Sequence, residues 1–131
     1  MFLIDTDTMI YFLNGDPQVQ ASMVRHEKDP KALSVITYGE LLYGAAKSQR
    51  PLPNTARVRR AAELLPVIEI RPPIAELFGA LKASLEKDGE RLDDFDLLIA
   101  ATALTLNYAI VTNNEKHFRR IEGLRVENWS K

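Results

Sequence analysis

Short apolar segments alternate with helical patterns along the chain, and this alternation limits the possible folds most strongly. The apolar segments are residues 2–4, 33–36, 67–70, 109–111 and 124–126. Each is three or four residues long and is bounded by polar residues or proline, as short buried strands are. Strands that alternate with helices predict a parallel sheet with helices on both faces, and active groups at the carboxyl ends of the strands.

Three segments have the spacing of helices. Apolar residues recur every three or four positions over residues 37–47 and 74–87, whereas residues 95–106 are apolar on almost every side. We therefore expect the last segment to form a helix at the centre of the fold. Gly89 and Asn107 are expected to end the second and third helices, because both residue types tolerate a left-handed backbone.

Composition narrows the classes of function. The chain of 131 residues has no repeat or linker, which predicts one α/β domain over residues 1–131. It has no cysteine, which excludes thiolate chemistry and fits a reducing, cytoplasmic location, and it has no apolar run long enough to cross a membrane. Its 17 basic and 18 acidic residues give a net charge of −1, so any contact with nucleic acid must be local. Glycine-rich nucleotide motifs and a serine-hydrolase elbow are absent.

Two acidic residues each have a structural and a functional interpretation. Asp5 follows the strand at residues 2–4 directly, which fits either a helix N-cap or an active-site carboxylate at the edge of the sheet. Glu40 follows Thr37 by three residues, and Thr-x-x-Glu before an apolar helical pattern is typical of a capping box. Considered alone, Glu40 is therefore interpreted as a structural residue.

Further polar residues lie at the start of the most apolar helix and after the fourth strand. Asp93, Asp94 and Asp96 exceed what capping one helix requires, and a cation would relieve their mutual repulsion. Asn114 follows the strand at residues 109–111, with His117 one turn later, and it fits a cap or a ligand. Such oxygen ligands favour Mg²⁺ or Mn²⁺, and ions of this kind support phosphodiester hydrolysis.

Four ordered blocks carry a resemblance to a known family. They are Leu-Ile-Asp-Thr at residues 3–6, Ile-Thr-Tyr-Gly-Glu-Leu-Leu-Tyr-Gly-Ala at 36–45, Phe-Asp-Leu-Leu-Ile-Ala-Ala at 95–101, and the segment from Val-Thr-Asn-Asn to Phe at 111–118. With these blocks the chain resembles the PIN-domain ribonucleases over nearly its whole length, and among them the VapC-type toxins of prokaryotic toxin–antitoxin pairs.

The resemblance implies specific roles and partners. It implies that Asp5, Glu40 and Asp96 are catalytic residues that bind the metal, and that Asn114 occupies the position of a further catalytic acid. It also implies a Mg²⁺-dependent endoribonuclease that acts on RNA, with tRNA among the substrates of such toxins. The partners implied are a second copy of the chain in a homodimer, and a cognate antitoxin whose tail lies over the acidic pocket.

The chain departs from the family pattern in ways that leave alternatives open. Many members have a fourth acid at the position of Asn114 or His117, so the number of metal ions stays open. Asp7, in place of the usual Asn or Ser, either restores the charge or hydrogen-bonds the other acids. The run Asp-Thr-Asp-Thr at 5–8 also fits a haloacid dehalogenase-like phosphatase, although such enzymes have their late acid pair after an apolar strand. A non-catalytic module that binds RNA or a partner is the other alternative.

Two features outside the acidic blocks also have two interpretations. A stretch without acidic residues at 41–62 either contacts phosphates or forms a solvated helical face. It contains Lys47, Arg50, Arg57, Arg59 and Arg60. His26 is expected at the surface, and Trp129 is expected to attach the end of the chain to the core.

Overall fold

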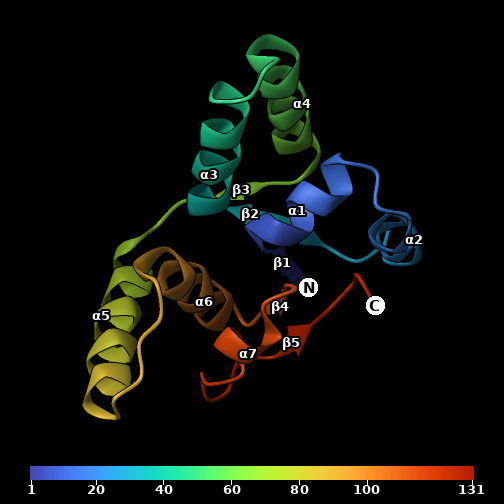
Figure 1. Ribbon diagram of the computed structural model, residues 1–131. Coiled ribbons are helices and arrows are strands. Elements are labelled where there is room, and N and C mark those ends of the chain that lie inside the picture. Colours follow the sequence, from blue (N-terminus) through green and yellow to red (C-terminus); the bar gives the residue numbers. More distant parts are fainter.

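The computed structural model describes residues 1–131 and contains a five-stranded, fully parallel sheet with the order β3-β2-β1-β4-β5. The strands are β1 (Phe2–Ile4), β2 (Lys31–Ser34), β3 (Val67–Ile68), β4 (Ala109–Val111) and β5 (Val126–Glu127). Because β1 lies in the middle, its carboxyl end is flanked by the ends of β2 and β4. The predicted α/β class and single parallel sheet are confirmed (Figure 1).

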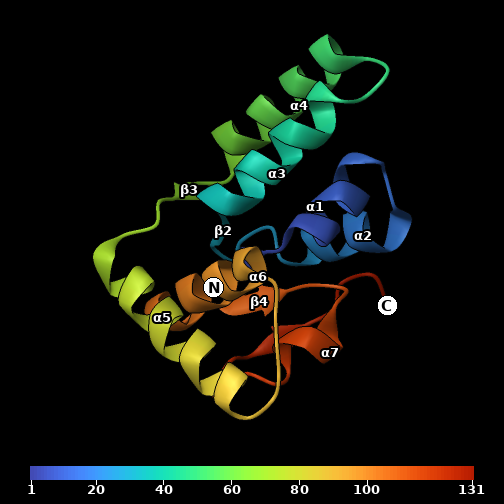
Figure 2. The ribbon, with the colours of Figure 1, turned by 60° about the vertical axis from the view of Figure 1, so that its left-hand side comes forward.

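Seven helices connect and cover the strands. They are α1 (Thr6–Leu13), α2 (Pro17–Arg25), α3 (Val35–Ala46), α4 (Pro51–Leu64), α5 (Pro72–Lys87), α6 (Asp94–Leu106) and α7 (Glu115–Phe118). Figure 2 shows α3 and α4 side by side, extending away from the sheet, with α5 and α6 packed together in a separate pair. None of these helices is long and apolar enough to span a membrane.

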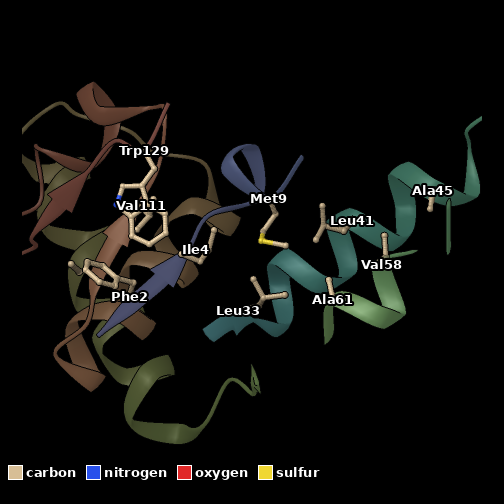
Figure 3. Packing of buried hydrophobic residues seen from close by; sticks show 11 residues of the cluster. Phe2, Ile4, Met9, Leu33, Leu41, Ala45, Val58, Ala61, Val111 and Trp129 are labelled. Atoms are coloured by element: carbon tan, nitrogen blue, oxygen red, sulfur yellow. The ribbon is translucent and has the colours of Figure 1, made fainter. Parts of the chain in front are cut away.

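The strands bury apolar side chains on both faces. Phe2 and Ile4 pack in a cluster with residues of α1, α3 and α4 (Figure 3), whereas Leu3, between them in sequence, packs with α5 and α6. This division follows from the alternation of side chains along a strand. It gives the molecule two hydrophobic layers, one on each side of the sheet.

The helix ends predicted from Gly89 and Asn107 are confirmed. Gly89 follows the C-cap of α5 with φ of +76°, and Asn107 is the C-cap of α6 with φ of 58°. Helix α6 buries six side chains between residues 97 and 103, as expected for the central helix. They are Leu97, Ile99, Ala100, Ala101, Thr102 and Ala103.

The predicted boundary between the second strand and its helix is wrong by two residues. β2 ends at Ser34, and α3 begins at Val35 because the Ser34 side chain accepts a hydrogen bond from the Ile36 backbone N–H at 3.0 Å. Thr37 is therefore buried inside the helix and is not its N-cap. Two other strands differ by as much: β3 ends two residues earlier than the predicted segment 67–70, and β5 begins two residues later than predicted.

Trp129 attaches the end of the chain to the core, as predicted. Its side chain is buried, and its ring stacks on His26 with 4.6 Å between the centroids and 3° between the planes. His26 is predicted at the surface and is partly exposed there, with 28% of its side chain accessible and its Nδ1 at 2.7 Å from a carboxylate oxygen of Asp29. Its ring also packs against Phe2 and Trp129, which the sequence did not predict.

Candidate active site

Asp5 lies at the carboxyl end of the central strand, at the position where open parallel sheets place their sites. Its Oδ1 accepts a hydrogen bond from the Thr6 N–H at 2.8 Å, so it is the N-cap of α1. Its Oδ2 accepts from the Thr112 hydroxyl, also at 2.8 Å. The two interpretations of Asp5, helix cap and site carboxylate, are therefore compatible.

Burial dominates the electrostatics of Asp5. The residue is only 3% exposed. Removal of the carboxylate from water, together with the nearby charges of Asp7 and Asp96, raises its pKa to about 7. The hydrogen bonds from Thr112 and Thr6 oppose this shift without cancelling it. A buried carboxylate with a pKa near neutrality is typical of a functional site.

Asp7 belongs to the same acidic cluster. Its Oδ2 accepts a hydrogen bond at 3.1 Å from the backbone N–H of Asn113, which lies in the loop after β4. Its negative charge contributes to the raised pKa values of both Asp5 and Asp96. Asp7 thus adds charge to the cluster and is oriented by the backbone that follows β4.

The structure replaces the capping-box interpretation of Glu40. Because Ser34 and not Thr37 caps α3, the Glu40 carboxylate is free to reach another element. Its Oε1 accepts a hydrogen bond from the Thr6 hydroxyl at 2.6 Å. The hydroxyl groups of Thr6 and Thr37 lie 3.1 Å apart, so both threonines support this end of α3. The side chain therefore belongs to the acidic cluster.

Asp96 comes from the first turn of α6 and faces the same region. Burial raises its pKa to about 6, with further contributions from the charges of Asp93 and Glu40. His117 on α7 has the opposite effect, and its Nδ1 lies 4.0 Å from Asp96 Oδ2. The site therefore joins acids from α1, α3 and α6 with an imidazole from α7.

The other two acids at the start of α6 have structural roles. Asp93 is the N-cap, and its side chain accepts a hydrogen bond from the Phe95 N–H at 3.1 Å. Asp94 is directed to α5, where its carboxylate lies 3.0 Å from Lys82 Nζ. Of the three crowded aspartates, Asp96 thus has the contacts of a site residue.

Asn114 lies beside the site without a side-chain hydrogen bond. The residue is exposed and is the N-cap of α7. Its backbone N–H donates to Thr112 Oγ1 at 3.0 Å, and Thr112 in turn donates to Asp5. The role of Thr112 was missed by the sequence interpretation, and the signal for it is a hydroxyl residue directly at the end of a buried strand.

The donor set was compared with the requirements of a divalent cation. No three carboxylate or imidazole groups are already arranged around one point as ligands. Neighbouring carboxylates do, however, raise the pKa values of Asp5 and Asp96, and these two residues have no basic partner beyond the imidazole of His117. Hard oxygen ligands with excess negative charge at a buried sheet edge fit Mg²⁺ or Mn²⁺.

The basic stretch after α3 divides between a groove and the outer surface. A cavity of about 250 Å³ lies between α1, α3 and α4, and Glu40, Asn54 and Arg57 line it together with apolar residues. Arg59 and Arg60 are exposed and do not line it. One arginine of the stretch therefore shares a groove with a site carboxylate.

Known proteins share both the sequence and the architecture of this chain. A sequence model of the PIN domain matches residues 2–124. Ribonuclease VapC2 of Haemophilus influenzae is 34% identical over 128 residues, which cover 98% of this chain and 97% of the relative. The tRNA(fMet)-specific endonuclease VapC of Shigella flexneri is 33% identical over 129 residues, with 98% of each chain covered.

Solved structures agree with these matches. The crystal structure of VapBC2 from Rickettsia felis, bound to a DNA fragment from their promoter, matches with a TM-score of 0.91 and 32% identity, and 98% of each chain is covered. The DNA-bound VapBC from Salmonella typhimurium gives the same TM-score and identity, with 98% of this chain and 97% of the other covered. The parallel sheet, the acids at its carboxyl edge and these similarities over almost the whole sequence lead to one conclusion: this chain belongs to the PIN-domain family, in the group of VapC ribonucleases.

Proposed function

We propose that this protein is a divalent-metal-dependent endoribonuclease toxin that hydrolyses phosphodiester bonds of RNA and is neutralised by a cognate antitoxin. The observation that carries the proposal is the meeting of Asp5, Glu40 and Asp96 at one edge of the sheet, where burial and mutual repulsion raise the pKa values of both aspartates. The relatives named ribonuclease and tRNA(fMet)-specific endonuclease support RNA as the substrate, with tRNA the first candidate.

The carboxylates of Asp5, Glu40 and Asp96 would hold Mg²⁺ or Mn²⁺, with Asn114 and His117 beside them. When bound, such an ion neutralises charge on the scissile phosphate and lowers the pKa of a water molecule. Thr112 orients Asp5, and Thr6 orients Glu40, through the hydrogen bonds described above. The hydrogen bonds thus limit the movement of two of the acids before an ion binds, whereas the complete set of ligands would come together only with the ion.

The acidic cluster also indicates how an antitoxin inhibits the protein. The similar structures include VapBC proteins and a toxin–antitoxin complex from Klebsiella pneumoniae, which supports a protein partner for this chain. An arginine side chain of that partner fits among Asp5, Glu40 and Asp96, because a guanidinium is planar and pairs with carboxylates through two hydrogen bonds. A homodimer of the toxin completes the proposed assembly.

Cleavage of RNA by the purified protein tests the proposal. Wild type should cut RNA in Mg²⁺ or Mn²⁺ and lose this activity in a chelator. Asp96→Asn should abolish cleavage, since an amide cannot supply the anionic ligand. Asp94→Asn is the matched control on the same helix, and it should keep activity because Asp94 is paired with Lys82 away from the site.

Two results would favour the alternatives. Equal activity of Asp96→Asn and wild type would remove the carboxylate cluster from the mechanism and leave a binding module on the same fold. Hydrolysis of a small phosphomonoester, without cleavage of RNA, would instead indicate a phosphatase.

A further inference from the structure

We propose that residues 128–131 are a positioning element for the active site, because they hold the loop at residues 112–114 from the side opposite to the carboxylates. The inference rests on the proposed function for its catalytic consequence. Its structural part stands on hydrogen bonds and ion pairs within the chain.

The loop at 112–114 orients two of the site carboxylates. Thr112 donates its hydroxyl hydrogen to Asp5, and the Asn113 N–H donates to Asp7 at 3.1 Å. The Asn114 N–H donates to Thr112 Oγ1 at 3.0 Å and so directs that hydroxyl group toward Asp5. A displacement of this loop would move both carboxylates or leave them without these donors.

The opposite side of the loop contacts residues 128–131. Ser130 Oγ lies 2.6 Å from Asn113 Oδ1 and 2.7 Å from Asn128 Oδ1, although a serine hydroxyl has only one hydrogen to donate. Asn113 Nδ2 is buried without a partner. With the Asn113 amide turned by half a rotation, its Nδ2 donates to Ser130 and Ser130 donates to Asn128, which gives each of these donors an acceptor.

A second set of contacts holds the start of α7, which carries His117. Asn128 Nδ2 and Lys131 Nζ each lie 2.9 Å from Glu115 Oε2, and Arg119 Nη2 lies 2.7 Å from Oε1. These three partners lower the pKa of Glu115 to about 2. The first residue of α7 is thus fixed by residues 128 and 131.

Trp129 anchors this segment to the body of the protein. Its ring stacks on His26, and its carbonyl oxygen accepts a hydrogen bond from the Ser22 hydroxyl at 3.2 Å. Figure 1 shows the segment running from β5 toward α2. Because Trp129 is immobilised by the core, its neighbours Asn128 and Ser130 are held at fixed positions against the loop.

The test uses substitutions in the full-length chain. Ser130→Ala removes the contact of the Ser130 hydroxyl group with Asn113, and the added change Asn128→Ala also removes the hydrogen bond to Glu115. Ser130→Thr keeps a hydroxyl group and should restore the contact with Asn113. Ser48→Ala is the matched control, because Ser48 also makes two hydrogen bonds, in the turn after α3 and away from the loop.

Three measurements are compared in these variants: hydrogen exchange of the Asn113 N–H, Mg²⁺ affinity by calorimetry, and the kinetics of RNA cleavage. In the double variant, exchange should rise several-fold, because the loop opens more often. Mg²⁺ affinity and kcat should each fall by roughly tenfold, whereas KM should stay unchanged. A tenfold loss is at the lower end of the range for residues that orient metal ligands. Ser130→Thr and Ser48→Ala should behave as wild type.

Wild-type exchange and Mg²⁺ affinity in the double variant would overturn the inference, and so would equal effects of Ser130→Ala and Ser48→Ala. If the double variant does not fold, the comparison of Ser130→Ala with Ser130→Thr decides. Faster exchange at Asn113 and weaker Mg²⁺ binding in a protein that cuts no RNA would support the positioning role while contradicting the proposed function.

Discussion

Asp5 combines two roles that usually belong to different residues, since it caps α1 and supplies a buried carboxylate. Its cap interaction stabilises the fold, whereas its burial next to Asp7 and Asp96 opposes ionisation. In the metal-free protein, the negative charge of Asp5 therefore destabilises the fold. An asparagine side chain at this position would remove the charge and keep part of the hydrogen bonding.

Asp5→Asn should abolish RNA cleavage and raise the thermal stability of the metal-free protein at about pH 8. Asparagine is as good an N-cap as aspartate, and it removes a charge that is buried beside other acids. We expect a gain on the order of 1 kcal/mol, measured by thermal unfolding in a chelator. A clear loss of stability would show that the ionised carboxylate holds this end of α1 together.

Glu40→Gln separates the charge of Glu40 from its hydrogen bond. A glutamine carbonyl oxygen still accepts from the Thr6 hydroxyl, so the melting temperature should stay within about 2 °C of the wild type, as for a change of about 0.5 kcal/mol or less. The anionic ligand is lost, so cleavage and Mg²⁺ binding should both fall strongly. Full activity of this variant would show that Glu40 serves only to join α1 and α3.

At the scale of elements, the start of α6 shows how one acidic run serves three purposes. Asp93 caps the helix, Asp94 pairs with Lys82 of α5, and Asp96 faces the site. Three acids within four residues can have three different roles because successive residues of a helix point in directions about 100° apart. Each side chain therefore contacts a different element.

Substitution of the first two acids should affect stability unequally. Asp93→Ala removes an N-cap and should cost about 1 kcal/mol of the free energy of unfolding. Asp94→Ala removes an exposed ion pair and should change this free energy by less than about 0.5 kcal/mol. Denaturant titration of both variants measures the difference, and a larger loss for Asp94→Ala would contradict the assignment of the cap.

The start of α7 bears on the number of metal ions that the proposed site would hold. Asn114 and His117 offer an amide and an imidazole there and not a carboxylate, so we expect one firmly bound Mg²⁺ and a weaker second ion. Asn114→Asp should increase Mg²⁺ affinity, and His117→Ala should reduce any preference for Mn²⁺ over Mg²⁺. Calorimetric titration of both ions into the variants measures this. Two tight Mg²⁺ sites in the wild type would instead assign a ligand role to Asp7.

At the scale of the whole molecule, the raised pKa values of Asp5 and Asp96 couple folding to pH. Their folded values of about 7 and 6 lie above the ordinary value of 3.8, so the folded state binds more protons than the unfolded state between these limits. The free energy of unfolding of the metal-free protein should therefore decrease as pH rises from about 4 to 8.

Glu115 has the opposite effect at lower pH. Its folded pKa of about 2 lies below the ordinary 4.5, so its stabilising contribution is present above about pH 4.5 and is lost as pH falls toward 2. Stability of the metal-free protein should thus be highest near pH 4 to 5. Added Mg²⁺ should stabilise the protein more at pH 8 than at pH 5, because its ligands must be deprotonated. Urea titrations at several pH values, with and without Mg²⁺, check both trends.

The five strands and three of the seven helices follow from the sequence by itself, whereas α1, α2, α4 and α7 were not predicted. The apolar helix at 95–106 and the stop signals Gly89 and Asn107 depend on local chemistry, and the structure confirms them. The candidate acids were also found without the structure: Asp5 from its position directly after a strand, and Glu40 and Asp96 from the resemblance to the PIN-domain ribonucleases.

Tertiary structure decided which local interpretation holds where two were open. Thr37 and Glu40 have the spacing of a capping box, but Ser34 takes the cap and leaves Glu40 free to contact Thr6, 34 positions away. His26 has Asp29 as a partner nearby in sequence, but the stacking of its ring on Trp129 joins it to the other end of the chain. Residues 128–131 reach the active-site loop only because β5 pairs with β4. In each case the deciding contact joins residues far apart in the chain, and local propensity contains no information about such contacts.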